Sequence, residues 1–142
     1  MSERHAWEDH YPKGLQWNSP LHPLPVYALL DRTRQKFGAR PAFNFMGKQL
    51  TWDQVGSLVD RMAKGLHDLG VERGVKVGLC LPNTPYFMIA YYAIAKTGAT
   101  VVNYNPLYTE DQLRHQIEDS QTDIIITTDL HVVYDKMEAM LA

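Results

Sequence analysis

The chain has 142 residues, of which 45% are hydrophobic and 21% charged, and its formal net charge is −2. This length is enough for one hydrophobic core and short for two. The near-balanced charge argues against a nucleic-acid partner, and no apolar run approaches the ~18 residues that cross a membrane, so at most peripheral membrane contact is expected.

Residues 1–24 are expected to form an irregular N-terminal arm, because prolines recur in them and no helical or strand period is present. The arm has mixed charge and lacks the apolar segment of a secretory signal. Its aromatic residues are expected to pack either on the surface of this chain or on a second subunit; they are Trp7, Tyr11 and Trp17. Residues 25–142 are expected to form the folded part.

A first helix is predicted to begin at Pro25, a residue suited to the first turn of a helix. Apolar residues then follow at helical spacing as far as Phe37, and Gly38 is the expected end of the helix. The residues predicted to share the apolar side are Val26, Leu29, Leu30, Thr33 and Phe37.

A hairpin and a second helix are predicted next. Residues 42–45 and 49–51 are short strand candidates around a turn that contains Gly47. Thr51 and Gln54 have the spacing of a capping box, so the helix should begin there, and Gly70 should end it. Its predicted apolar stripe consists of Val55, Leu58, Val59, Met62, Leu66 and Leu69.

The remainder alternates between strands and helices. Strands are predicted at 75–81, 100–103 and 124–128. The helices are predicted to begin at Pro85, after a Thr109–Gln112 capping box, and after Asp129 as a cap. Strands joined in this way pair in parallel through right-handed crossovers. The fold class is therefore α/β, a partial doubly wound parallel βαβαβ sheet preceded by a helix, a hairpin and the arm.

This sheet is expected to be part of a larger domain. The helix at 85–96 is apolar around most of its circumference, as in helices with neighbours on several sides. The last helix reaches Ala142 without a terminating residue, and a three-stranded parallel sheet leaves both edges open. We therefore expect the chain to self-associate through the open edges or through the arm.

The sequence contains none of the compact motifs of catalysis or metal binding. Neither GxxxxGK[ST] nor GxGxxG occurs, and the histidines lack the spacing of metal ligands. Cys80, the single cysteine, lies in an apolar strand and is expected to be a buried structural thiol, which suits a reducing cytoplasm. We assign no catalytic residue and no metal ligand.

Two loops follow the carboxyl ends of predicted parallel strands, where open α/β sheets bind ligands. The loop at 81–85 is best explained as a rigid turn into a helix. The loop at 104–108 has two aromatic residues, an amide and a leucine, which is more than a turn requires. A binding role and a simple turn remain equally favoured for this second loop.

The chain resembles the N-terminal region of AMP-forming acyl-CoA synthetases, most closely the long-chain fatty-acid branch. The resemblance is carried by WEDHYPKG at the start, FMGKQLTW in the hairpin, and GLCLPNTPYFMIAYYAIAKTGATVVNYNPLYT across two strands. The spacing is consistent over almost the whole chain. No single motif is specific by itself.

The resemblance implies an enzyme that uses ATP and Mg²⁺ to form an acyl-adenylate and then transfers the acyl group to CoA. The phosphate loop and catalytic lysine of the family have no counterpart in these residues, which implies an incomplete subdomain at 25–142. The resemblance places the loop of Tyr104, Asn105, Pro106 and Leu107 beside the tunnel for CoA. An arginine that some relatives use for the CoA 3′-phosphate has no match near Val133; Lys136 is a weak substitute.

The leading hypothesis is thus the N-terminal segment of a fatty-acid CoA ligase that is catalytically incomplete by itself. A medium-chain or aryl-acid CoA ligase fragment is an alternative within the same superfamily. A stand-alone, non-catalytic interaction module is the alternative from another class. Fatty acid, ATP and CoA are the expected partners of the full-length enzyme, and the cytoplasm, with peripheral membrane contact at most, is its expected location.

Overall fold

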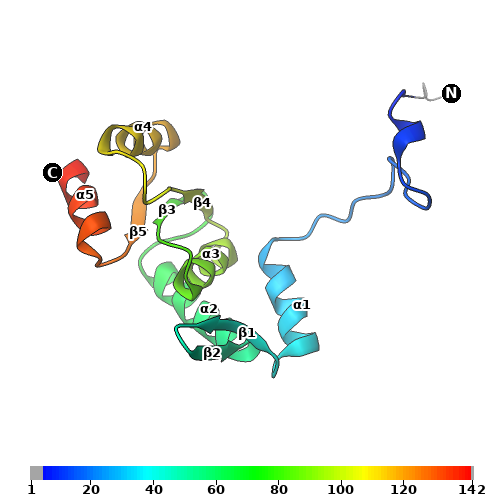
Figure 1. The fold of residues 1–142 in the computed structure, drawn as a ribbon, viewed down its shortest axis with the longest axis horizontal. Coiled ribbons are helices and arrows are strands. Elements are labelled where there is room, and N and C mark those ends of the chain that lie inside the picture. Colours follow the sequence, from blue (N-terminus) through cyan, green and yellow to red (C-terminus); the bar gives the residue numbers. More distant parts are fainter. Residues whose placement is uncertain (1–4, 142) are drawn as a thin grey trace.

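The computed structural model describes residues 5–141, so the first four residues of the predicted arm and Ala142 lie outside the described part. The arm is irregular apart from a short 3₁₀ helix, η1 (Glu8–His10). It extends away from the helices and strands that follow (Figure 1). Within the arm, rings pack on one another: His5 stacks on Trp7 with centroids 4.4 Å apart, and Trp17 meets Trp7 edge to face at 6.4 Å.

The first helix, α1 (Tyr27–Phe37), begins two residues later than predicted. Leu30 is buried, whereas Val26 and Leu29 are exposed, so the predicted apolar side is only partly covered. Gly38 follows the helix with a right-handed φ of −46°, so it does not act as a left-handed cap. A Cβ at Gly38 would meet the carboxylate of Asp53, which is the end of an exposed side chain, so this contact alone does not require a glycine.

The predicted hairpin is confirmed. Strand β1 (Pro41–Phe45) pairs antiparallel with β2 (Lys48–Thr51). The turn between them places Met46 and Gly47 at positive φ, 50° and 76°, which is the geometry of the tight hairpin turns that match strand twist.

Helix α2 (Trp52–Asp68) begins with the predicted capping box: the Thr51 hydroxyl accepts the N–H of Gln54, and the Gln54 side chain accepts the N–H of Thr51. Leu69 was expected in the buried stripe, but it is 75% exposed. Gly70, at φ +87°, reverses the chain directly after it. Val71 is buried in place of Leu69, and its N–H donates to Leu66 O at 2.9 Å.

The parallel sheet is confirmed, with strand order β4-β3-β5. Its strands and helices are, in chain order, β3 (Lys76–Cys80), α3 (Pro85–Thr97), β4 (Thr100–Asn103), α4 (Glu110–Ser120), β5 (Ile124–Thr127) and α5 (His131–Leu141). The Thr109–Gln112 capping box of α4 is present as predicted. Helix α5 differs: the Thr128 hydroxyl, not Asp129, accepts the N–H of Leu130 ahead of the helix.

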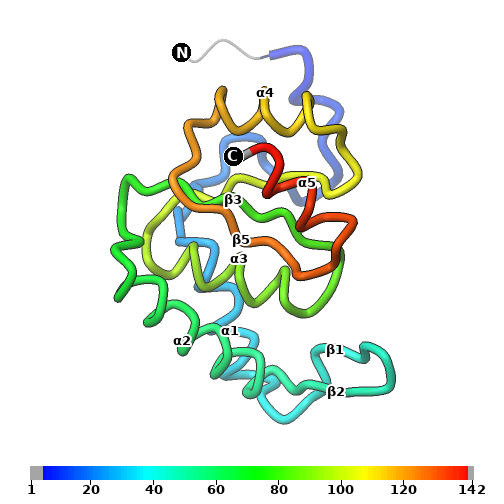
Figure 2. Tube along the Cα trace, turned by 90° about the vertical axis from the view of Figure 1, so that its left-hand side faces the viewer, coloured from blue at the N-terminus to red at the C-terminus, as the bar shows by residue number. Residues whose placement is uncertain are grey.

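Helices cover both faces of the sheet, as Figure 2 shows. On one face, Val77 and Leu79 share a core with residues of α2 and α3, and α1 packs against these two helices. On the other face, Cys80 and Tyr104 pack with Leu113 of α4 and with residues of α5. Helix α3 contacts α1, α2, β3 and β4, which explains why its sequence is apolar on several sides.

The register between β3 and β5 is fixed at the amino end of the strands. The Asp123 carboxylate accepts the N–H of Lys76 at 2.8 Å, and the N–H of Asp123 donates to Lys76 O at 2.9 Å. Within the described residues, β4 and β5 each pair on one side only, so both are edge strands. No helix of residues 5–141 has the length and apolarity needed to cross a membrane.

Candidate functional site

The carboxyl edge of the sheet brings three loops together, because the three strands run parallel. Residues 81–84 follow β3, residues 104–109 follow β4, and residues 128–130 follow β5. This edge is where ligands bind in open α/β sheets. The candidate site therefore lies where the sequence pattern placed it, and the geometry of each loop indicates what it can do.

Tyr104 begins the second loop and is almost entirely buried, with 3% of its surface exposed. Its ring lies against Gly78 in the middle of β3, and a Cβ at that glycine would overlap ring atom Cε2. Its hydroxyl is hydrogen-bonded to the hydroxyls of Ser120 and Thr122. The buried ring of Tyr104 thus anchors the loop to the sheet and is not presented to solvent.

Asn105, Pro106 and Leu107 form a tight turn above that anchor. The Asn105 side-chain oxygen accepts the N–H of Leu107 at 3.0 Å, and its main-chain oxygen accepts the N–H of Tyr108 at 3.0 Å. In an Asx turn of this kind the side chain supplies a hydrogen bond that holds the backbone of the turn. Leu107 is left 87% exposed, which makes it the apolar side chain that this loop offers to a ligand.

Lys136 of α5 ties the same loop to the helix behind it. Its ammonium group donates to Pro106 O at 3.2 Å and to Tyr108 O at 2.8 Å. Val133, one turn earlier on α5, is buried in the core. The ammonium group of Lys136 is therefore already hydrogen-bonded to main-chain carbonyls, which leaves it less able to bind a phosphate.

A cavity of about 650 Å³ lies beside the first and third loops. Leu81, Pro82 and Thr84 form one side, Thr128 and Leu130 another, and Met62 of α2 with Ile89 of α3 form the floor. The sequence pattern indicated only a turn at 81–85 and missed this cavity. Its walls come from elements distant in sequence, and the only available signal was that both loops follow parallel strands.

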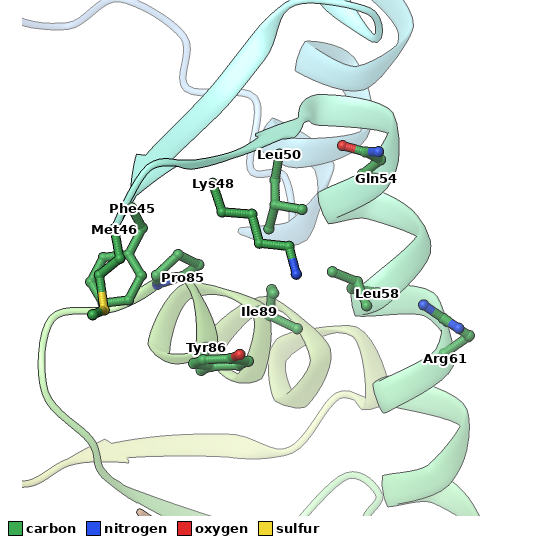
Figure 3. A pocket seen from close by; sticks show the side chains of 10 residues that line it. All are labelled: Phe45, Met46, Lys48, Leu50, Gln54, Leu58, Arg61, Pro85, Tyr86 and Ile89. Carbon is green, nitrogen blue, oxygen red and sulfur yellow. The ribbon is translucent and has the colours of Figure 1, made fainter.

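A second cavity, of about 630 Å³, lies between the hairpin, α2 and α3 (Figure 3). It was also not predicted, because it depends on how the hairpin is placed against the two helices. It contains none of the four loop residues 104–107.

Ionic contacts brace the three helices on the first face of the sheet. Asp60 of α2 bonds to Lys96 of α3 and to Arg34 of α1, the latter at 2.9 Å. The hydrogen bond from Lys96, followed by that from Arg34, lowers the pKa of Asp60 against an opposing effect of burial. These charges have structural partners and stand apart from the loops.

Cys80 at the end of β3 is fully buried, as predicted. Burial raises the pKa of its thiol, so the thiolate needed for nucleophilic attack is disfavoured. Nor do residues 5–141 gather three histidine, cysteine or acidic side chains in a way that could hold a metal ion. The loops can therefore shape a binding surface, and Asp129 is the acidic side chain among the residues that line the cavity beside it.

Comparison with known proteins assigns the family. The model of the AMP-binding enzyme family matches residues 30–141, which is most of the chain. The chain belongs to the AMP-binding enzyme family. Over 130 residues, or 92% of its length, it is 34% identical to a long-chain-fatty-acid–CoA ligase of Bacillus subtilis. The predicted resemblance to AMP-forming acyl-CoA synthetases is confirmed.

Solved structures share the fold. The N-terminal domain of FACL13 from Mycobacterium tuberculosis matches 83% of this chain with a TM-score of 0.77 at 23% identity. The chain covers 30% of that domain and 23% of the length of the Bacillus ligase. A plant relative, 4-coumarate–CoA ligase 4 of Arabidopsis thaliana, is 38% identical over 81 residues.

Proposed function

We propose that this chain is the N-terminal α/β segment of a long-chain fatty-acyl-CoA ligase and is catalytically incomplete by itself. The observation that carries the proposal is the 34% identity to a bacterial long-chain-fatty-acid–CoA ligase over 92% of the chain. In such an enzyme a fatty acid and ATP give an acyl-adenylate and pyrophosphate, and CoA then displaces AMP. We place this enzyme in the cytoplasm.

The part of this segment in the reaction is to shape the approach to the adenylate. Leu107 offers an apolar wall to the pantetheine arm of CoA, the Asx turn of Asn105 with Pro106 holds that wall in place, and Tyr104 anchors it to the sheet. ATP and Mg²⁺ do not fit the described residues, which lack both a phosphate loop and a carboxylate cluster.

Pyrophosphate exchange tests the proposal. The 142-residue chain with palmitate, ATP and Mg²⁺ should show no exchange. A fusion in which this chain replaces the matching segment of the Bacillus subtilis ligase should show palmitate-dependent exchange. Exchange by the chain alone, or a folded fusion that is inactive with every acid, would contradict the proposal.

An aryl-acid or medium-chain ligase is the second candidate within the family. The 38% identity to a coumarate ligase over 81 residues supports this second candidate. The same fusion, tested with octanoate and 4-coumarate beside palmitate, separates the two. Preference for either competitor over palmitate would replace the long-chain assignment.

A stand-alone interaction module is the candidate from another class. It is favoured by the two edge strands, β4 and β5, and by the half-exposed rings of Trp7 and Trp17 in the arm. We propose self-association through these edges or the arm for the isolated chain. Light scattering after size exclusion should show a dimer or larger species, and a version beginning at Pro25 should show whether the arm is responsible; a monomer would reject self-association.

A further inference from the structure

The outer edge of β5 carries main-chain groups that no neighbouring strand uses. The N–H of Asp123 donates to Lys76 O at 2.9 Å, so Asp123 faces β3. Successive residues of a strand direct their N–H and C=O groups to opposite sides, so Ile124 and Ile126 face away from β3. Within residues 5–141, β5 pairs with β3 alone, and no hydrogen bond outside the sheet involves the main-chain N–H or O of either isoleucine. An edge of this kind can pair with a further strand.

The outer edge of β4 is less open. Tyr104 donates its N–H to Leu79 O in β3 at 2.9 Å, so its neighbour Asn103 faces away from β3. On that side the Gln116 side chain of α4 already donates from Nε2 to Asn103 O at 3.1 Å. A side chain thus takes the place that the N–H of a neighbouring strand would occupy. Of the two edges, β5 is therefore the better one for strand pairing.

The sequence of β5 suits pairing with a second copy of itself. Its three consecutive isoleucines carry no charge, and β-branched residues stabilise cross-strand pairs. Ile124 and Ile126 pack with the core beside α2 and α3, and Ile125 packs with the core beside α4 and α5. An antiparallel alignment centred on Ile125 places this residue opposite Ile125 of the second copy, and Ile124 opposite Ile126 of the second copy. Each core then continues across the pair.

Hydrogen bonding and charge both select this alignment. It joins the two outward-facing isoleucines in hydrogen-bonded pairs, whereas a shift by one residue would set outward groups against inward ones. A shift by two residues in one direction would place Asp123 opposite Asp129 of the second copy, and directly opposed like charges destabilise a sheet. A shift by two residues in the other direction would require the N–H of Thr122, which already donates to Ile117 O.

We propose that two copies of this chain pair along β5, antiparallel and centred on Ile125, so that their two three-stranded sheets become one sheet with two-fold symmetry. The inference rests on the self-association that we propose for the isolated chain, and it assigns that self-association to one surface. It does not depend on ligase activity, which the pyrophosphate exchange of the fusion reports separately.

Disulfide trapping of the full chain tests the alignment. In a Cys80→Ala background, which removes the single cysteine, Ile125→Cys should form an intermolecular disulfide under mild oxidation. Directly opposed residues of this type have Cα atoms about 4.5 Å apart, which a disulfide can span. Val102→Cys is the matched control, because Val102 is half-buried against the same core but lies in β4. Most of the Ile125→Cys chain should migrate as a dimer in non-reducing electrophoresis, and the Val102→Cys chain should migrate as a monomer.

Light scattering after size exclusion provides a second test. Ile124→Pro removes an N–H that faces away from β3, and proline is tolerated at such positions of edge strands. This variant should convert the dimer to a monomer of 16.3 kDa. Val101→Pro, at an outward-facing position of β4, is the matched control and should remain a dimer. Circular dichroism of both variants should show that the helices are retained.

Three results would overturn the proposal. The first is an unmodified chain that is monomeric at every concentration tested. The second is equal disulfide formation by Ile125→Cys and Val102→Cys. The third is a dimer that persists in folded Ile124→Pro, which would leave self-association standing through another surface. If Ile124→Pro does not fold, the comparison of the two cysteine variants decides.

Discussion

The ring of Tyr104 occupies the space that a side chain at Gly78 would need. Gly78 lies in the central strand β3, and Tyr104 directly follows the edge strand β4. A Cβ at Gly78 would overlap Cε2 of the ring and would also lie 3.2 Å from Cγ2 of Thr122. The anchor of the loop at 104–107 therefore depends on a glycine in a different strand.

Gly78→Ala should lower the free energy of unfolding by about 1–3 kcal/mol, because the added methyl group displaces the Tyr104 ring in a packed core. Urea titration followed by circular dichroism measures the change. Gly65→Ala is the matched control: Gly65 lies in helix α2 with open space around its Cβ position. That variant should stabilise by about 0.5–1 kcal/mol, and a similar loss in both would contradict the packing argument.

Tyr104→Phe should cost about 0.5–1.5 kcal/mol of stability, because its hydroxyl bonds to Ser120 and Thr122 are lost. The cost stays moderate since those two hydroxyls also bond to each other at 2.8 Å. Thermal unfolding checks the value. Tyr108→Phe, which removes a hydroxyl with no hydrogen bond in the described chain, should have no effect of that size.

Asp60→Asn should destabilise the contact of α1, α2 and α3 at neutral pH by less than about 1 kcal/mol, because the carboxylate is partly exposed. The hydrogen bond from Lys96 holds the pKa of Asp60 below its usual value of 3.8. Its contribution is therefore present above that pH and is lost as the pH falls through the lowered pKa of the folded state.

Urea titrations of Asp60→Asn and the unmodified chain at several values of pH should show this convergence. Their difference in unfolding free energy should persist at neutral pH and vanish in strong acid. Asp119→Asn, at an exposed residue of α4 without an ion pair in the described chain, serves as control. A difference for Asp60→Asn that grows toward acid would show that the sign is wrong.

Lys136→Gln should loosen the loop at 104–109, because it removes the charged donor to Pro106 O and Tyr108 O. Hydrogen exchange at the N–H groups of Leu107 and Tyr108 should accelerate about fivefold, as expected for ~1 kcal/mol of lost local stability. Lys64→Gln, which breaks only a surface pair with Asp68 on α2, should leave this exchange unchanged. Equal rates in the two variants would show that the Asx turn alone holds the loop.

Sequence signals predicted the elements whose ends are set by local hydrogen bonds. The capping boxes at Thr51 and Thr109 mark helix starts in the structure because donor and acceptor lie within a few residues of each other. Burial was predicted less well. Leu69 continues the apolar period of α2 but follows its last turn, so the chain reversal at Gly70 carries it into solvent.

The position of the loop at 104–107 was predicted, and its packing was not. The rule that loops meet at the carboxyl edge of parallel strands located residues 104–107. The Tyr104 ring packs against Gly78, which lies in a different strand. No local sequence pattern encodes packing between separate strands. The cavity beside Lys48 depends on where the hairpin lies against α2 and α3, so it became visible only with the fold.

The reciprocal main-chain and carboxylate bonds between Lys76 and Asp123 clamp β3 to β5 at the end of the sheet opposite the loops. These bonds set the alignment of β3 with β5 at the end of the sheet away from the loops. Insertions or exchanges in the loops after β3 and β5 can then change what is recognised without shifting the strands beneath them. The scaffold thus separates the residues that align the strands from the loops at the opposite edge, so the loops can vary while the alignment is kept.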